Sequence, residues 1–599
     1  MNSSVRPGPP DEAADTRLAQ AMQAFQAGDL KQAREQCLRI IDNDPHRSPA
    51  LHLLSTIYLQ SGHLNDAHQC SQSAVSNAPS NAIYLNGLGL TLHALGRLED
   101  AEATFEKAIT LQSDLPDLLN NKAAVQIDRD HLTQALETLR DALRLEPSHS
   151  NALVNKALVL QKFGRTIEGM KYLDQAFEQQ PQSIEIAHNR LMMLNYSSAH
   201  SAADVLEHTT SYWRLKDRLS PPIEPFIHGH QFKQKSKKPL RIGYVSADLF
   251  DHPVGRILLP ILKAHNKQDF SLFLYANNVA EDHISKEMKS NDCTWHAIYN
   301  RSDDDVAAQI KKDGIDVLID LSGHTDGNRL GVFRHKPAPI QMTWLGHVAT
   351  TGLSEIDYII ADRFVLPEGD EHFYTESALR LPNAHLCFSP PGETPAPQHA
   401  PAESNPFITF GCFSNITKLN ERVISTWSRI LERVPESKLL IKNASLSNDA
   451  VAQSVRQQFA DSGTPRDQVI VLGKTNYNDH INTFGHVDIA LDPFPYGGMT
   501  TTLETLWMGV PVIALAGQSW AGRVSASILT LMGIPELITR SEEEYIAKAV
   551  TFAQDQEGLA AIRRNTRVLL ESSPLCDISR FAKSLERLYQ NAWQAHCQA

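Results

Sequence analysis

Residues suited to binding a phosphate group are concentrated between Asp488 and Gly509, in the stretch DIALDPFPYGGMTTTLETLWMG. A short apolar run ends at Asp492, a loop carries the pair Gly497-Gly498, and Thr500–Thr502 open a segment with helical spacing of apolar residues. A strand, a glycine-bearing loop and a helix N-terminus bring together unpaired backbone N–H groups and the positive end of a helix dipole. This arrangement suits a phosphate, and the threonine hydroxyls add donors. The plain alternative is a helix cap on an ordinary α/β crossover.

Other side chains that could take part in chemistry follow predicted strands or the same helix start. Lys418 follows the strand ITFGCF, where an ammonium group can neutralise a departing diphosphate, although taken by itself it is better interpreted as a solvated surface lysine. His252 follows the first strand of the α/β region, in DHPVG, and can act as acid, base or pyrophosphate donor near neutral pH. His324 ends another strand on the same edge. Glu504 lies one helical turn beyond Thr500, where a carboxylate can accept from ribose hydroxyls.

Length and composition indicate a multidomain globular protein. A chain of 599 residues is too long for one core, and 42% hydrophobic with 21% charged residues is typical of folded domains. The net charge of −13 argues against broad binding to nucleic acid or to an anionic membrane. Seven cysteines without a CxxC pair indicate reduced thiols and no zinc site. The chain shows neither a signal-peptide core nor a long apolar run, so we expect a cytoplasmic protein.

The first third of the chain repeats with a period of 34 residues. Turn residues recur at Gly28, Gly62, Gly96, Asp130 and Gly164, with a small residue five positions later and, in four of the five units, a proline seventeen positions later. A Gly or Asp permits a sharp turn, a small residue lets two helices approach closely, and proline ends the second helix. This is the tetratricopeptide pattern, which predicts a superhelix with a concave protein-binding groove. A purely structural spacer is the alternative.

From Leu240 onward, short apolar runs alternate with helical segments, which predicts parallel sheets with right-handed crossovers. A Pro-rich stretch separates two such blocks, so we expect two doubly wound domains that face each other across a cleft. The expected organisation is an unstructured N-terminus over 1–14, five repeats over 15–184, a degenerate capping repeat with linker helices over 185–238, a first α/β domain over 239–390, a Pro-rich linker over 391–405 and a second α/β domain over 406–599.

The α/β region contains four long motifs in a fixed order: RIGYVSADLFDHPVG, KPAPIQMTWLGHVATTGLSEIDYIIAD, GCFSNITKLNERVISTWSRILERVPES and DIALDPFPYGGMTTTLETLWMGVPVIALAGQSWAGRVSAS. In this order they resemble the glycosyltransferase family of O-GlcNAc transferase and the SPINDLY proteins, family 41. The resemblance covers essentially the whole chain and is of the bacterial type with N-terminal repeats. It implies an α-helical tetratricopeptide superhelix followed by a GT-B fold, that is, two Rossmann-like α/β domains of which the second binds a nucleotide sugar.

The resemblance also implies roles for individual side chains. Lys418 and the pair Thr500 and Thr501 match residues that contact the nucleotide diphosphate in the family, which reverses the surface interpretation of the lysine. Asn415 matches a glutamine that contacts the nucleotide, and Glu504 stands where the family has an acidic residue. The second domain would therefore hold most of the donor site.

Histidines complete the set of candidates that the resemblance implies. His480 matches a histidine that packs on the nucleotide base, for which an ordinary helix-surface histidine is the alternative. His252 matches a histidine important for activity whose role as general base is contested. The loop GHVATTG resembles a family loop near the sugar and the acceptor. The candidates near the sugar and acceptor are His324, His347 and Thr351.

Several positions depart from the family pattern and bear on the donor. Tyr477 and Thr483 stand where the animal enzymes have a lysine and an arginine, and Met499 stands where they have a histidine before the paired threonines. The sequence FPYGGMTTT is closer to the FPYAGTTTT of SPINDLY, which uses GDP-fucose in plants. In contrast, DHPVG and WAGRVSAS look more like the GlcNAc transferases.

Together these observations predict an inverting, metal-independent O-glycosyltransferase that moves GlcNAc from UDP-GlcNAc to Ser or Thr of polypeptides bound along the repeat groove. Lys418 with the helix N-terminus would replace a metal ion, and no cofactor besides the nucleotide sugar is expected. The alternatives are a GDP-fucose or UDP-glucose transferase, a non-catalytic repeat adaptor, and transfer to a small or lipid-linked acceptor. We expect no nucleic-acid or membrane partner, whereas oligomers fit the family because some of its repeat arrays dimerise.

Overall fold

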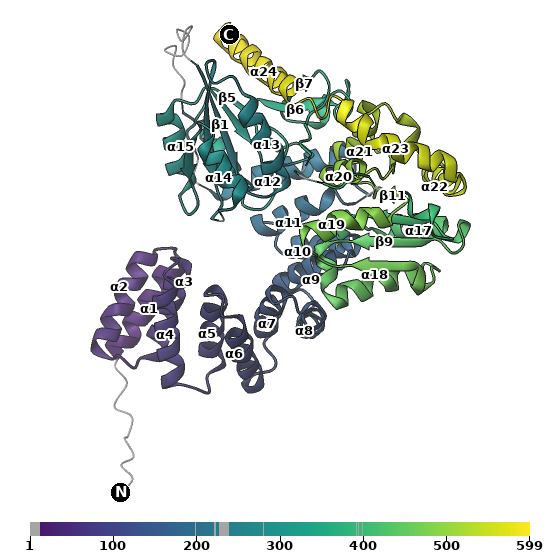
Figure 1. Ribbon diagram of the computed structural model, residues 1–599. Coiled ribbons are helices and arrows are strands. Elements are labelled where there is room, and N and C mark those ends of the chain that lie inside the picture. The colour runs from purple at the N-terminus through teal and green to yellow at the C-terminus, as the bar shows by residue number, and fades with distance from the viewer. Residues whose placement is uncertain are drawn as a thin grey trace. The chain divides into compact units, whose positions relative to one another are not determined.

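The computed structural model describes residues 12–197, 199–220, 223–226, 239–279, 281–390, 392, 394–397 and 399–598. The chain divides into two compact units (Figure 1). The smaller unit contains residues up to Val159 and the segment Lys171–Gln179, and the larger contains Leu160–Met170 and everything from Gln180 onward. Most of the N-terminus expected to be unstructured lies outside the described residues, and the first helix begins at Glu12.

Helical hairpins form the repeat region, as the period of 34 residues predicts. The helices are α1 (Glu12–Gln26), α2 (Leu30–Asn43), α3 (Ser48–Gln60), α4 (Leu64–Asn77), α5 (Ala82–Ala94), α6 (Leu98–Leu111), α7 (Pro116–Asp128), α8 (Leu132–Leu145), α9 (Ser150–Lys162) and α10 (Thr166–Gln179). Each predicted turn residue has a positive φ, between 60° at Asp130 and 81° at Gly28. The small residues five positions later are buried, so they allow the helices of a hairpin to approach closely.

Two further helices, α11 (Ile184–Leu194) and α12 (Ala202–Leu219), belong to the larger unit. They stand where a degenerate repeat and linker helices were predicted. Helix α12 packs on the first α/β domain: Tyr212 and Trp213 are buried in the same apolar cluster as Leu318 and Phe333. Much of the predicted linker beyond Leu219 lies outside the described residues.

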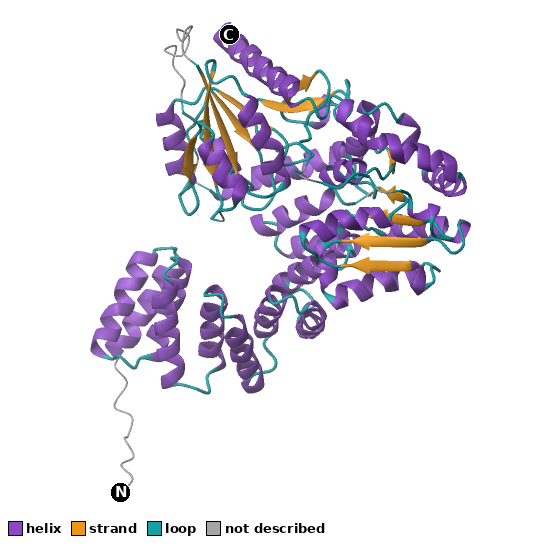
Figure 2. Cartoon of the chain, in the orientation of Figure 1, coloured by secondary structure: helices purple, strands orange, loops and turns teal. Residues whose placement is uncertain are grey.

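The first α/β domain is built on a parallel sheet with the strand order β3-β2-β1-β4-β5-β6-β7 (Figure 2). Its strands are β1 (Leu240–Ser246), β2 (Phe270–Ala276), β3 (Thr294–Ala297), β4 (Val317–Asp320), β5 (Ile340–Thr343), β6 (Tyr358–Asp362) and β7 (Ser377–Leu381). Its helices are α13 (Pro253–Ala264), α14 (His283–Ser290), α15 (Asp303–Asp313) and α16 (Leu330–Arg334). The edge strands β3 and β7 were not predicted, because they lack a continuous apolar run.

The second α/β domain has a parallel sheet with the order β10-β9-β8-β11-β12-β13. Its strands are β8 (Thr409–Cys412), β9 (Lys438–Lys442), β10 (Val469–Leu472), β11 (Ile489–Leu491), β12 (Val512–Leu515) and β13 (Ile538–Thr539). Its helices are α17 (Glu421–Arg433), α18 (Asp449–Asp461), α19 (Tyr477–Thr483), α20 (Thr500–Trp507), α21 (Trp520–Leu531), α22 (Glu542–Gln554) and α23 (Gln556–Ser572). The predicted architecture of helical repeats followed by two doubly wound domains is therefore confirmed.

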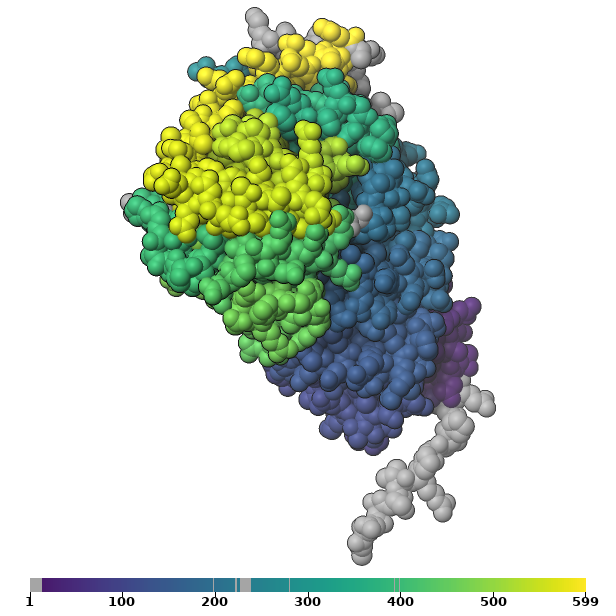
Figure 3. Space-filling view, turned by 90° about the vertical axis from the view of Figure 1, so that its right-hand side faces the viewer, coloured from purple at the N-terminus to yellow at the C-terminus, as the bar shows by residue number. Residues whose placement is uncertain are grey.

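The last helix, α24 (Ile578–Gln598), belongs to the second block in sequence but packs on the first sheet. Its Tyr589 hydroxyl lies 3.2 Å from that of Tyr244 in β1, and the Phe581 ring stacks on Trp344 with centroids 6.1 Å apart. The second domain predicted over 406–599 thus ends in a helix that packs on the first α/β domain. In Figure 3 the green and yellow surface of the second domain adjoins the teal surface of the first.

Both sheets reverse their strand order at one position, between β1 and β4 in the first sheet and between β8 and β11 in the second. At such a switch point the crossover helices leave on opposite faces of the sheet, so a crevice forms beyond the carboxyl ends of the two central strands. His252 follows β1 and His324 follows β4, whereas Lys418 follows β8 and Thr500 follows β11. The topology therefore brings these four predicted site residues to the two switch points.

Candidate functional site

Lys418 ends the short turn η4 (Ile416–Lys418) that follows β8. Its Nζ donates to the Gly497 carbonyl oxygen at 2.7 Å and lies 3.9 Å from the centre of the Tyr496 ring. Burial lowers the pKa of Lys418 to about 8, while the nearby charge of Asp492 raises it. Lys418 is thus a partly buried cation held against the glycine loop.

The N-terminus of α20 follows that loop. Met499, at the capping position, supplies no side-chain hydrogen bond. Thr500 Oγ1 is buried without a hydrogen-bond partner among the described residues, and Thr501 Oγ1 lies 3.4 Å from Ser414 Oγ after β8. The first backbone N–H groups of a helix have no partner within the helix, and its dipole is positive at this end. An anion bound here would therefore meet unused donors.

Gly498 is required by close packing in the loop before α20. A Cβ at this position would lie 2.3 Å from Thr502 Oγ1 and 2.8 Å from Thr501 Oγ1. Gly498 N donates to Asp492 Oδ1 at 2.7 Å. Burial raises the pKa of Asp492 to about 6, although hydrogen bonds from Ser525 and from Gly498 lower it. Asp492 therefore fixes the loop from inside.

A cavity of about 660 Å³ lies between the two α/β domains. Its lining includes Asp251 and Arg256 of the first domain and Tyr477, Thr500 and Glu504 of the second. Arg256 Nη1 donates to Glu504 Oε1 at 3.3 Å, so an ion pair joins the two domains at the cavity. Burial raises the pKa of Glu504, whereas Arg256 lowers it. A cavity of this volume can hold a ligand of nucleotide size.

Asn415 and His480 lie near the same strand ends. Asn415 is exposed, and its Oδ1 accepts a hydrogen bond from Thr417 N at 3.1 Å, which starts the turn to Lys418. The His480 ring contacts Phe413 and Phe484 nearly edge-on, with centroids 6.1 and 5.3 Å away. Burial and nearby cations lower the pKa of His480, so its imidazole is neutral at pH 7. A neutral, apolar-backed ring at this position suits packing against a base.

His252 caps the N-terminus of α13 on the first domain. Its Nδ1 accepts a hydrogen bond from Val254 N at 3.4 Å, and Asp248 Oδ1 lies 3.8 Å from the same nitrogen. Burial lowers the pKa of His252, while Asp248 raises it. A neutral imidazole that accepts at Nδ1 carries its proton on Nε2. The flanking residues Asp251 and Pro253 line the cavity between the domains.

The candidates near the predicted sugar and acceptor loop differ in burial. Thr351 is fully buried; its N donates to Glu376 Oε1 at 2.7 Å, and its carbonyl accepts from His324 Nε2 at 2.7 Å and from Trp213 Nε1 at 2.8 Å. His324 is 1% exposed, and burial lowers its pKa well below the usual range. These two residues hold the loop in place. His347 is partly buried, its Nε2 has no hydrogen-bond partner among the described residues, and burial lowers its pKa to about 4.

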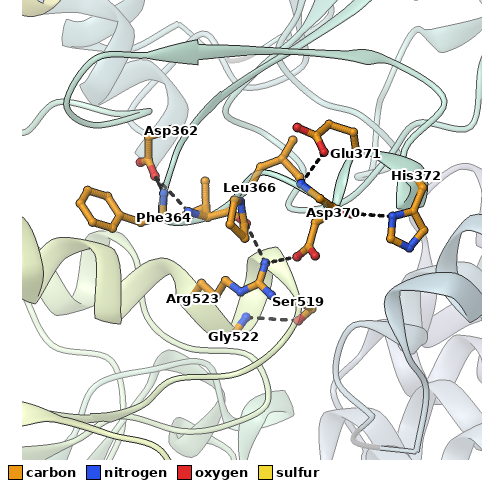
Figure 4. Close-up of polar contacts among 12 residues, drawn as sticks. Asp362, Phe364, Leu366, Asp370, Glu371, His372, Ser519, Gly522 and Arg523 are labelled. Carbon is orange, nitrogen blue, oxygen red and sulfur yellow. Dashed lines mark hydrogen bonds and ion pairs between the residues drawn. The ribbon is translucent and has the colours of Figure 1, made fainter.

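Helix α21 connects the second domain to the first (Figure 4). Arg523 Nη1 donates to Asp370 Oδ2 at 2.6 Å and to the Val365 carbonyl oxygen at 3.5 Å. On the same helix, Ser527 Oγ lies 3.4 Å from Asp362 Oδ2. These contacts join the motif WAGRVSAS to the strand IDYIIAD and the loop after it, so they hold the two domains together.

The structure brings Lys418, Thr500 and Thr501 together around one loop and adds Glu504 at the cavity. Arg256 and Asp492 are not among the residues predicted from the sequence. The sequence contains a feature that could have identified each of them: Arg256 lies one helical turn after His252, and Asp492 is the acid that ends the apolar run of β11. Among the residues that the structure describes, no three His, Cys, Asp or Glu side chains gather as metal ligands would. Within the same residues, no helix is long and apolar enough to traverse a lipid bilayer.

Profiles of known families match most of the chain. The profile of glycosyl transferase family 41 matches residues 217–388 and 401–585. A tetratricopeptide profile matches residues 52–116, and a coatomer epsilon subunit profile matches residues 91–192 within the helical region. The first match covers both α/β domains and the others cover repeats.

Curated proteins and a solved structure are also similar. The probable UDP-N-acetylglucosamine--peptide N-acetylglucosaminyltransferase SPINDLY of Solanum lycopersicum is 34% identical over 423 residues, which cover 70% of this chain and 45% of that protein. The protein of the same name from Oryza sativa subsp. japonica is 35% identical over 424 residues, with the same coverage of 70% and 45%. The chain thus spans about half the length of these relatives. A solved mutant of the Thermobaculum terrenum O-GlcNAc transferase has a TM-score of 0.68 and 28% identity, covering 99% of both chains.

Proposed function

This chain belongs to glycosyl transferase family 41, and we propose that it is a protein O-glycosyltransferase that moves GlcNAc from UDP-GlcNAc to Ser or Thr side chains. The observation that carries this proposal is the group of donors at the switch point of the second sheet. There, the Lys418 ammonium lies against the glycine loop, and the N-terminus of α20 follows without a capping side chain. The names of the SPINDLY relatives, which denote N-acetylglucosaminyltransferases, support the choice of donor.

The proposed reaction inverts the configuration at the sugar C1. The acceptor hydroxyl attacks C1 while the bond from C1 to the diphosphate oxygen breaks, and the hydroxyl proton leaves to a base. The negative charge that develops on the diphosphate is stabilised by Lys418, by the hydroxyls of Thr500 and Thr501 and by the first N–H groups of α20. Donors that are already in position stabilise such charge strongly, because they need not reorganise during the reaction.

We assign His252 the role of a hydrogen-bond donor to the diphosphate or sugar. The alternative role, that of general base, requires an unprotonated ring nitrogen directed at the acceptor. Because Nδ1 accepts from Val254 N, the neutral ring carries its proton on Nε2 and can donate from that nitrogen. Another group or the solvent would then receive the acceptor proton.

We propose that polypeptide acceptors bind along the repeats. Side chains on successive repeats form a ladder of amides: Asn121 Nδ2 donates to Asn86 Oδ1 at 2.9 Å, and Asn155 Nδ2 donates to Asn120 Oδ1 at 2.9 Å. Amide side chains carry both donors and acceptors, and Asn86, Asn121 and Asn155 remain partly exposed, so they suit the backbone of an extended peptide of any sequence. The proposed reaction takes place in the cytoplasm.

GDP-fucose is the second candidate donor. The loop sequence FPYGGMTTT is close to that of the SPINDLY proteins, and Met499 replaces the histidine of the animal GlcNAc transferases. Both features lie beside the proposed diphosphate site, so they bear directly on which nucleotide sugar fits.

A thermal-shift panel of UDP, GDP, UDP-GlcNAc and GDP-fucose tests the proposal. A ligand that binds only the folded protein stabilises it by about 2.7 kcal/mol at a hundred times its Kd. We expect the largest shifts with UDP and UDP-GlcNAc, and much smaller shifts in Lys418→Met. Larger shifts with GDP and GDP-fucose would select the fucosyl donor. If no nucleotide shifts the wild-type protein, the transferase proposal is wrong and a repeat adaptor is favoured.

A further inference from the structure

The turn of the fifth repeat contacts the turn that carries Lys418. Thr166 Oγ1 donates to the Thr417 carbonyl oxygen at 3.0 Å. A Cβ on Gly164 would lie 3.2 Å from the Ile416 carbonyl oxygen, so the two backbones approach closely. Gln458 Nε2 of α18 donates to the Phe163 carbonyl oxygen at 3.1 Å. All of these residues belong to the larger unit, so the fifth repeat's turn is part of the body that holds the nucleotide-binding domain.

The repeat register shows that this contact is specific to the fifth unit. Two residues after the turn residue, the first four units have leucine, at Leu30, Leu64, Leu98 and Leu132, whereas the fifth has Thr166. The turn glycines of the first three units have no atom within 4 Å of a Cβ built on them, in contrast to Gly164. Thr166 is 1% exposed. A buried hydroxyl has thus replaced an apolar side chain where the repeat meets η4.

A second contact reaches Lys418 through the ring beside its ammonium group. Tyr196 follows α11, and its ring lies 5.1 Å from the Tyr496 ring, centroid to centroid. Tyr496 in turn lies under the Lys418 ammonium, 3.9 Å from the ring centre to Nζ. Tyr196 therefore backs the aromatic ring on which the lysine rests.

We infer that Thr166 and Tyr196 are positioning residues for Lys418: they hold the backbone before it and the ring beneath it, so that segments before the α/β domains help to form the diphosphate site. This inference rests on the proposed function for the statement that Lys418 meets a diphosphate. Its physical basis is that one hydrogen bond fixes the carbonyl of the preceding residue, while ring contact limits where Nζ can lie. Neither Thr166 nor Tyr196 is required to touch a ligand.

The test compares Thr166→Val, which keeps the shape but removes the hydroxyl, with Thr166→Ser, which keeps the hydroxyl. The matched control is Thr138→Val, which removes a hydroxyl that donates to Gln126 Oε1 at 2.9 Å within the repeat unit. Titrations of the full chain measure the affinities for UDP and uridine, and for GDP and guanosine. We expect Thr166→Val to lower the diphosphate affinity about three- to tenfold, the scale of one net hydrogen bond, without changing nucleoside affinity. Thr166→Ser should restore it, and Thr138→Val should have no effect.

Tyr196→Leu and Tyr196→Phe test the second contact with a readout that needs no nucleotide. Reductive methylation of Lys418, followed by mass spectrometry, reports how exposed and how deprotonated its amine is. We expect Tyr196→Leu to change the methylation rate at least about threefold, because the ring support is lost, whereas Tyr196→Phe should behave as the wild type. Thr166→Val should also change this rate, and Thr138→Val should not.

The outcomes separate the two proposals. If folded Thr166→Val and Tyr196→Leu keep both the diphosphate affinity and the methylation rate of the wild type, the positioning inference is overturned. Equal losses of diphosphate and nucleoside affinity would also overturn it, because a general loss of structure would explain them. If the wild type binds no nucleotide, the proposed function fails, while the methylation rates still decide whether these residues position Lys418.

Discussion

Replacing Lys418 with methionine isolates the charge at the centre of the proposed diphosphate site. Methionine has a similar length and keeps an apolar side chain over the Tyr496 ring, but it cannot donate to the Gly497 carbonyl oxygen. The substitution also removes a partly buried cation, so the cost of its desolvation disappears. We therefore expect the fold to survive and the chemistry to be lost.

The expected magnitude follows from the contacts of the lysine. For stability, one lost hydrogen bond and one lost cation–π contact, each worth about 1 kcal/mol, are partly offset by the removed desolvation cost. The free energy of unfolding should therefore change by no more than about 1–2 kcal/mol. For catalysis, removing one well-placed donor to a developing negative charge lowers kcat by about 10²–10³-fold. Loss of the ammonium should exceed the lower end of that range because it carries a full charge.

The assay combines initial rates with donor and acceptor peptide, titration with UDP and GDP, and thermal unfolding. Lys583→Met in α24 is the matched control, because Lys583 is exposed and lies outside the described site. We expect the control to retain its rate and Lys418→Met to lose it, with both variants unfolding cooperatively near the wild-type temperature. A folded Lys418→Met protein with the wild-type rate would refute the assignment of the site.

The same variant gives a test by pH. Burial places the pKa of Lys418 near 8, below its ordinary value of 10.5. The diphosphate affinity of the wild type should thus fall above about pH 8, as the ammonium is lost, and that step should be absent in Lys418→Met. For stability the sign is opposite: burial of the ammonium costs free energy below pH 8, and this cost is relieved as the pH rises from about 8 to 10.5. The difference in stability between wild type and variant should therefore shift in favour of the wild type across that window.

Three further substitutions test other parts of the site. His252→Ala should lower the affinity for the nucleoside diphosphate about tenfold through loss of the Nε2 donor; an unchanged affinity with kcat reduced about 10²-fold or more would make His252 the base instead. Gly498→Ala should abolish nucleotide binding in titrations, because its Cβ would lie 2.3 Å from Thr502 Oγ1, and a normal Kd would contradict the loop geometry. Glu504→Gln should weaken UDP and uridine equally, since the carboxylate is expected at the ribose; a loss confined to UDP would place it at the diphosphate.

The repeats could be predicted because their geometry restricts residue type at single positions. A turn with positive φ favours glycine or aspartate, and such a turn recurs every 34 residues, from Gly28 to Gly164. Central strands were equally visible as apolar runs, since both of their faces are buried. The edge strand β3 was not, because Thr294 and Ala297 are exposed and its sequence TWHA has no apolar run.

The candidate site could be predicted in part for a related reason. Lys418 and Thr500 lie in the loops after β8 and β11, and parallel strands deliver their carboxyl ends to one edge, so the alternation of strands and helices placed both residues there. The role of Lys418 came from the family resemblance, because local sequence favoured a surface lysine. The pair Arg256 and Glu504 joins residues 248 positions apart, and no local pattern shows such a contact. The sequence also did not show that Thr351 is buried. Thr351 was a candidate for contact with the sugar or acceptor, yet its hydroxyl donates to a buried carboxylate.

The contacts of Lys418 show why the proposed donor site cannot be attributed to the second domain by itself. The lysine stands on a turn held by Thr166 from the fifth repeat, rests on a ring backed by Tyr196, and donates to the glycine loop that Asp492 fixes from within. These contacts come from segments far apart in the sequence, and each one restricts the same ammonium group. Because electrostatic stabilisation depends on donors that are held in place before the charge develops, we expect the turn of the fifth repeat, which belongs to the larger unit, to contribute to the proposed site.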